Sequence, residues 1–135
     1  ILSAGLGHKP EIPGVGLLTA TAAVATMGNA SVFRSGREFA AWIGLVPRQT
    51  GSGGKVTLHG ISKRGDTYLR TLLVHGARSV LRVKKDPDAW CERLQSRRPL
   101  NVAIVAQANK TARTIWAILA RGVAYQRDHV SVRPA

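Results

Sequence analysis

The sequence of residues 100–121, LNVAIVAQANKTARTIWAILAR, decides the fold of this 135-residue chain. Apolar residues recur in it at helical spacing, so one face of a long helix is expected to be buried. We expect that face to consist of Val105, Ala108, Ala112, Ile115, Trp116 and Leu119. Gly122 follows the last periodic residue and is expected to end the helix.

Four further helices are expected upstream of this one. They are an Ala- and Thr-rich helix over residues 15–27 ending at Gly28, a short helix opened by Ser35 and Glu38 and ending at Gly44, a helix over residues 66–84, and a helix carrying Trp90 and Leu94 after Asp86-Pro87. Ser35 and Glu38 have the spacing of a capping box. The expected buried face of the helix over residues 66–84 comprises Leu69, Leu72, Leu73, Gly76, Ala77 and Val80.

The segment from Pro47 to Gly60 is expected to be a loop, because only residues 55–59 alternate as a short strand would. The predicted fold class is therefore all-α: a compact helical domain with a helix-hairpin-helix-like element and a glycine-rich loop. We expect one domain over residues 1–135, with residues 1–13 as an entry loop or a truncated helix end and residues 123–135 as a loose basic tail. Because the chain begins at Ile1 rather than Met, we expect it to be a fragment or a processed form of a longer protein.

The charge of the chain indicates a polyanionic partner. Lys and Arg number 20 against 7 Asp and Glu, which gives a formal net charge of +13. Neutralising a phosphate releases condensed counterions, so we expect such a chain to attract nucleic acid, with an anionic membrane surface as the alternative. No apolar run is long enough to cross a bilayer and no leader opens the sequence, which favours a cytoplasmic, nucleoid-associated protein over a membrane-bound one. A ribosomal protein would have the same charge balance.

Metal and disulfide chemistry are not expected in this chain. Cys91 is the only cysteine, which excludes an internal disulfide and a thiolate zinc cluster. The histidines, which show no ligand spacing, are His8, His59, His75 and His129. No metal site is therefore predicted.

The segment Ile12-Pro13-Gly14-Val15-Gly16 resembles the hairpin of a helix-hairpin-helix element. Gly14 and Gly16 would allow a tight turn, so that amides at the start of the next helix face a phosphate. The alternative is a plain glycine turn between two helices. Phosphate binding by Gly14 and Gly16 is the functional prediction.

Basic residues are concentrated between residues 48 and 85, with Asp66 as the single acid among them. The predicted phosphate contacts are Arg48, Lys55, Lys63, Arg64, Arg70, Arg78 and Arg82. We expect Arg70, Arg78 and Arg82 to form an exposed stripe on the helix over residues 66–84. Because Tyr68 is the only nearby aromatic residue, phosphate contact is favoured over base stacking. A solvated basic face is the alternative.

Ser52 lies in the sequence Gly51-Ser52-Gly53-Gly54. A serine between glycines can have an accessible hydroxyl, and flanking cations could stabilise charge on a phosphoryl group. Read alone, the same sequence is also typical of a flexible linker. No histidine or carboxylate stands beside it as an obvious base.

Several motifs together resemble a transposase family of bacterial insertion sequences. They are the run FRSGREFAAWIGLVPR over residues 33–48, GSGGK over residues 51–55, ISKRGD over residues 61–66, and Tyr68-Leu69-Arg70. The similarity is strong over residues 12–82 and weaker in the last helix. It implies an N-terminal RNase-H-like domain with four carboxylates, a C-terminal domain bearing a serine, and recombination of DNA guided by a structured bridge RNA.

The resemblance assigns the nucleophilic serine to Ser52, just past Pro47-Arg48 and directly before Gly53. Ser62 is better interpreted as a helix-start residue or a phosphate contact, and Ser35 as a helix cap. The remaining serines weighed as candidates are Ser31, Ser79 and Ser96. Ser52 is therefore the predicted catalytic residue.

The chain departs from the family in lacking the carboxylate domain. Its 7 acids are scattered, so no cofactor is expected here and Mg²⁺ is expected in the missing N-terminal domain. The resemblance implies DNA, a structured guide RNA and further copies of the full-length protein as partners. The leading interpretation is an incomplete transposase enzyme. The alternatives are a non-catalytic DNA- or RNA-binding module and a structural protein of a ribonucleoprotein particle.

Overall fold

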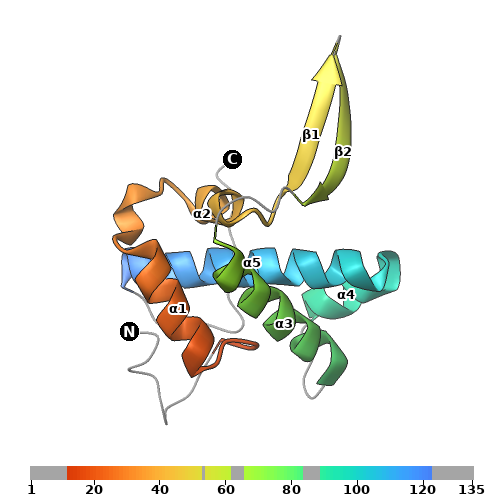
Figure 1. The fold of residues 1–135 in the computed structure, drawn as a ribbon. Coiled ribbons are helices and arrows are strands. Elements are labelled where there is room, and N and C mark those ends of the chain that lie inside the picture. The colour runs from red at the N-terminus through yellow and green to blue at the C-terminus, as the bar shows by residue number, and fades with distance from the viewer. Residues whose placement is uncertain (1–11, 53, 62–65, 84–88, 123–135) are drawn as a thin grey trace.

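Helix α5 (Leu100–Arg121) is the element against which most of the other helices pack. The computed structural model describes residues 12–52, 54–61, 66–83 and 89–122, and for residues 47–61 apart from Gly54 it describes the backbone alone. Helices α2 (Gly36–Ile43), α3 (Thr67–Val83) and α4 (Ala89–Arg97) all contact α5. Figure 1 shows α5 running across the whole helical body. The prediction of a helical fold class is confirmed.

The buried face of α5 largely matches the periodicity of its sequence. Its buried residues are Ala103, Ile104, Gln107, Ala108, Thr111, Ala112, Ile115, Trp116 and Ile118. Val105 and Leu119, expected in the core, are only half-buried. The helix ends where expected, because Gly122 adopts a left-handed conformation (φ 65°) and donates its amide to the Ile118 carbonyl.

Helix α1 (Leu17–Met27) begins two residues later than expected and ends at Gly28, as predicted. Ser35 caps α2 by accepting a hydrogen bond from the Glu38 amide (3.2 Å), as the capping-box spacing predicted. Asp66 caps α3 in the same way, through the Leu69 amide (2.7 Å). Each cap satisfies an amide that the helix itself leaves unpaired.

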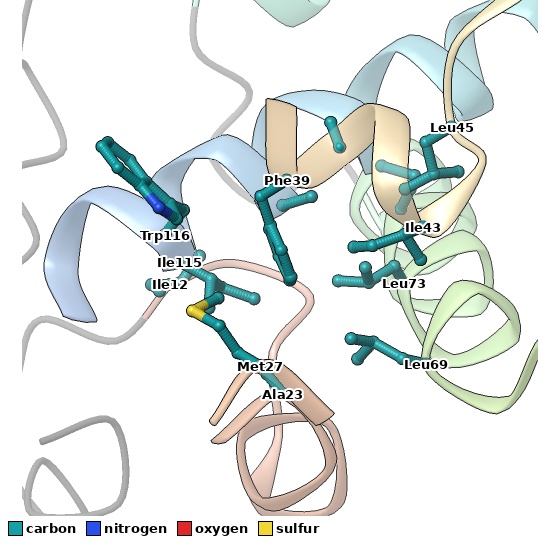
Figure 2. Close-up of a cluster of buried hydrophobic side chains, with 14 of the residues drawn as sticks. Ile12, Ala23, Met27, Phe39, Ile43, Leu45, Leu69, Leu73, Ile115 and Trp116 are labelled. Carbon is teal, nitrogen blue, oxygen red and sulfur yellow. The ribbon is translucent and has the colours of Figure 1, made fainter. Parts of the chain in front are cut away.

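The core forms where α1, α2, α3 and α5 meet. Figure 2 shows the side chains that converge there, among them Met27, Phe39, Ile43, Leu69, Leu73, Ile115 and Trp116. The Trp116 indole nitrogen donates a hydrogen bond to the Ala30 carbonyl oxygen (3.0 Å). Ala30 is the first residue of the 3₁₀ helix η1 (Ala30–Val32). Burying the indole therefore leaves no donor unsatisfied.

A β-hairpin occupies the segment that the sequence predicted to be a loop. Strands β1 (Pro47–Ser52) and β2 (Lys55–Ile61) pair antiparallel, with a register irregularity between Pro47 and Gln49. Residues 53 and 54 separate the strands, and Gly54 has a φ of 84°. Two glycines between strands are typical of a tight hairpin turn. The loop prediction was wrong because these strands pair through their backbones, in a hairpin that stands away from the helical body (Figure 1), and backbone pairing leaves no apolar alternation in the sequence.

Gly14 and Gly76 bring two backbones into direct contact. A Cβ on Gly14 would lie 2.8 Å from the Gly76 carbonyl oxygen, and a Cβ on Gly76 would collide with the Gly14 carbonyl oxygen. Gly14 also has a φ of 82°, which disfavours any side chain. The contact ties the segment before α1 to the middle of α3.

Gly76→Ala is expected to destabilise the fold, although alanine is the better helix former by about 1 kcal/mol. The collision with Gly14 forces the two segments apart, at a cost of about 1–3 kcal/mol beyond that gain. The measurement is the free energy of unfolding in urea. Gly16→Ala is the control, because its Cβ would meet nothing within 4 Å and its φ is −92°, so only the smaller cost of a poorer helix cap is expected. A more stable Gly76→Ala protein would show that the backbones can separate freely.

Candidate functional site

Ser52 lies at the tip of the hairpin. It is the last residue of β1, and its register partner across the turn is Lys55, the first residue of β2. Figure 1 shows this tip as the part of the hairpin farthest from the helices. The structure thus places two sequence-predicted site residues opposite each other, next to a turn that contains Gly54.

The other basic residues predicted near Ser52 are less completely described. Arg48 belongs to β1, next to Pro47, which pairs with Ile61 at the base of the hairpin. Lys63 and Arg64 follow β2 in sequence and lie outside the described residues.

Two side chains from the helical body hold the segment that leads into β1. Arg70 on α3 donates a hydrogen bond from Nη1 to the Ile43 carbonyl (3.1 Å). Asn109 on α5 donates from Nδ2 to the Leu45 carbonyl (2.8 Å). These carbonyls flank Gly44, the left-handed residue that ends α2 (φ 88°). The base of the hairpin is therefore fixed to two helices.

The predicted basic stripe of α3 divides into two parts. Arg78 and Arg82 are exposed, as expected. Arg70 is half-buried, and its guanidinium also bonds the Thr67 hydroxyl (3.4 Å). The sequence did not reveal this structural contact of Arg70, because helical spacing alone places all three arginines on one stripe. Phosphate binding by Arg70 stays a prediction.

Gly14 and Gly16 have different environments at the start of α1. The Val15 amide bonds the Ile12 carbonyl (3.1 Å), which closes a turn over this segment. A hollow of about 460 Å³ lies beside it, lined by both glycines together with Ile12, Pro13, Val15, Gly76 and Ser79. Packing against Gly76 accounts for Gly14, whereas Gly16 faces open space and is the helix cap. The first helix of a helix-hairpin-helix element would fall on residues outside the described part.

Neither a metal site nor a membrane span is found in the part of the chain that the structure describes. Within those residues, no three His, Cys, Asp or Glu side chains lie close enough to hold a metal ion. None of the described helices is long and apolar enough to cross a membrane.

Arg113 on α5 is a charged residue that the sequence analysis did not single out. It is half-buried, and its Nε atom is enclosed without a hydrogen-bond acceptor among the described residues. Burial, and after it the charge of Arg37, lowers the pKa of this guanidinium. The sequence held no signal for it, because an arginine in a long amphipathic helix is ordinarily a solvated residue.

The chain combines a helical body with a projecting β-hairpin and an excess of 20 Lys and Arg over 7 Asp and Glu, and comparison with known proteins shows its family. Residues 10–91 match the model of the transposase IS116/IS110/IS902 family. The chain is 54% identical over 119 residues to a probable family 20 transposase of Pseudomonas aeruginosa, covering 85% of this chain and 35% of that protein. It is 52% identical over 120 residues to the transposase for insertion sequence element IS1111A of Coxiella burnetii, covering 86% of this chain and 33% of that one.

The chain belongs to the IS116/IS110/IS902 transposase family. The transposase for insertion sequence element IS1328 of Yersinia enterocolitica is a further relative, 40% identical over 120 residues, 86% of this chain and 36% of that protein. The resemblance to insertion-sequence transposases is thereby confirmed. The chain spans about a third of the length of these curated relatives.

Asn109→Ala is expected to loosen the base of the hairpin. It leaves the Leu45 carbonyl, on a residue that is only 1% exposed, without its partner, at a cost of about 1–2 kcal/mol. Amide hydrogen exchange across residues 47–61 should accelerate as well. Asn101→Ala, at an exposed position of the same helix, is the matched control and should change little. Equal exchange rates in the two variants would show that the hydrogen bond from Asn109 to the Leu45 carbonyl does not hold the base of the hairpin.

Proposed function

We propose that this chain is the DNA-handling, serine-bearing part of an insertion-sequence transposase, in which Ser52 is the nucleophile. The observation that carries the proposal is the position of Ser52 at the tip of a projecting hairpin, in a member of a transposase family. A phosphodiester within a DNA strand is bulky and needs a site that stands clear of the protein body. A hairpin tip meets that requirement.

The proposed reaction transfers a phosphoryl group from DNA to the protein. The Ser52 hydroxyl oxygen bonds to phosphorus, the bond from phosphorus to one deoxyribose oxygen breaks, and that oxygen takes up a proton from water or a general acid and leaves as a hydroxyl group. The hydroxyl proton of Ser52 passes to a base. Because a serine hydroxyl is a weak nucleophile on its own, the base must be supplied beside it.

Cations close to Ser52 in sequence would act on the phosphate. Lys55 is its register partner, and Arg48 lies in the same strand. Together with Lys63 and Arg64 they would neutralise charge on the phosphoryl oxygens as the transition state forms. Charges that are in place before the reaction would need no rearrangement as the transition state forms.

The remaining components would come from the other two thirds of the transposase. The magnesium ion and the base implied by the resemblance require a carboxylate set, which the described residues of this chain do not form. Further copies of the full-length protein, a structured guide RNA and DNA are the proposed partners. In this arrangement the chain supplies the nucleophile and the basic residues that bind DNA.

A second candidate function is a nucleic-acid-binding module in which Ser52 is inert. The net charge of +13 favours it, because charge alone is enough for binding. The two functions differ in whether a covalent link between protein and DNA ever forms.

Ser52→Ala in the full-length transposase should abolish the covalent protein–DNA species and strand exchange together. DNA binding and folding should stay nearly intact, because a serine at a hairpin tip contributes little to the core. A denaturing gel that detects protein-linked DNA is the measurement. Ser62→Ala is the control and should weaken activity only in part. If the Ser52→Ala protein still forms the adduct, Ser52 is not the nucleophile.

Replacing both Arg78 and Arg82 with Gln should weaken nucleic-acid binding and flatten its salt dependence. If each contacts one phosphate, the slope of log affinity against log salt should fall by about 1.8 in magnitude on duplex DNA. Arg70 is kept in this variant because it bonds the Ile43 carbonyl. The control replaces Arg93 and Arg97, two exposed arginines of α4, and removes the same charge. An unchanged slope would mean that the stripe faces solvent or a partner protein.

A further inference from the structure

Arg113 sits in an environment that disfavours a lone cation. Its side chain is half-buried against the helical body, and the enclosed Nε–H has no acceptor among the described residues. A buried donor without a partner is costly, and a charged one more so. The enclosed Nε shows that part of the guanidinium is withdrawn from water, and an oxyanion that reached the terminal nitrogens would offset its charge.

A second arginine is brought to the same place by close packing of two helices. A Cβ on Gly36 would lie 3.0 Å from both Cα and Cβ of Arg113, so the first turn of α2 rests directly on the Arg113 segment of α5. Arg37, the next residue of α2, is exposed. Its charge acts on Arg113 and lowers the pKa of that guanidinium, after the larger effect of burial.

No acid in the described part of the chain compensates these two cations. Neither Arg37 nor Arg113 forms an ion pair there, although Glu38 is adjacent to Arg37 in sequence. The start of α2 adds the positive end of a helix dipole to the same region. The free protein therefore holds two like charges near each other, and an anion bound between them would offset their repulsion.

We propose that Arg37 and Arg113 form a binding site for a nucleic-acid backbone phosphate at the contact between α2 and α5. Guanidinium groups present paired donors that match phosphate oxygens. The excess of 20 cations over 7 acids makes a polyanion the fitting ligand rather than a single carboxylate. The proposal rests on the proposed function, that the transposase handles nucleic acid, and adds a contact outside the segment from residue 48 to residue 85.

This site is separate from the serine hairpin. Helix α2 runs from Gly36 to Ile43, so Arg37 in its first turn lies about 9 Å along the helix axis from the end that leads toward β1. A strand held at both places would be bound at two points rather than at the tip of the hairpin alone. The phosphate belongs either to DNA or to RNA, which share this chemistry.

The test compares Arg37→Gln, Arg113→Gln and the double variant in the full-length transposase. Affinity for single-stranded DNA, duplex DNA and RNA of one sequence is measured across a salt series. With the nucleic acid that occupies the site, each single variant should reduce the slope by about 0.7–0.9 and the affinity by about five- to tenfold near 0.1 M salt. Because both arginines hold one phosphate, the double variant should lose scarcely more than either single variant.

Two controls separate this site from a general effect of charge and from misfolding. Arg97→Gln removes the same charge from an exposed position of α4 and should change the slope less. Arg37→Gln removes a like charge beside Arg113, so its melting temperature should equal or exceed that of the wild type. This exposed position keeps the test valid even if Arg113→Gln fails to fold.

The outcomes distinguish this site from the proposed function. If the wild type binds nucleic acid but Arg37→Gln behaves like Arg97→Gln with all three probes, the site is refuted and the proposed function stands. Additive losses in the double variant would also refute a shared phosphate. A wild-type transposase that binds none of the probes would overturn both proposals. Loss with RNA alone would assign the site to a guide RNA, and loss with DNA alone to the substrate.

Discussion

The burial of α5 is the constraint on which the other elements depend. Small side chains on its buried face, Ala103, Ala108 and Ala112, are 0% exposed, and they allow neighbouring helices to approach closely. Helix α2 uses this proximity fully at Gly36, which has no side chain to hold the backbones apart. Because α2 ends at Gly44, the next residue, Leu45, lies where its carbonyl accepts a hydrogen bond from Asn109. The position of the hairpin therefore follows from the packing of a helix that contains none of its residues.

Local signals in the sequence predict the helices well because each signal is decided within a few residues. Ser35 lies three residues before Glu38, and the cap forms as this spacing requires. Gly28, Gly44 and Gly122 end their helices with positive φ, which glycine adopts without strain. Departures concern residues at the margin of a face, such as Val105, which is half-buried because neighbouring helices cover α5 only in part.

The hairpin and the contacts of the polar side chains could not be predicted in the same way. Strand β1 has the sequence PRQTGS, which lacks the β-branched alternation of a strand packed on a core. Strand β1 is held by backbone hydrogen bonds to β2, and such bonds leave no periodicity in the sequence that could be recognised. Arg70 and Asn109 were equally hidden, because their acceptors lie 27 and 64 residues away in the sequence. The sequence located Ser52 through its motif, and the structure shows which kind of element carries it.

The contact between Gly14 and Gly76 also bears on how sequences of this family can diverge. Most packed pairs tolerate change because a larger side chain on one partner can be offset by a smaller one on the other. Here the backbone atoms of two glycines are in direct contact, so neither residue has a side chain that a smaller one could replace. The pair should be held constant rather than vary in concert, and methods that detect neighbours by correlated substitution would not register it. This close backbone contact would therefore leave no trace in the sequence differences between relatives.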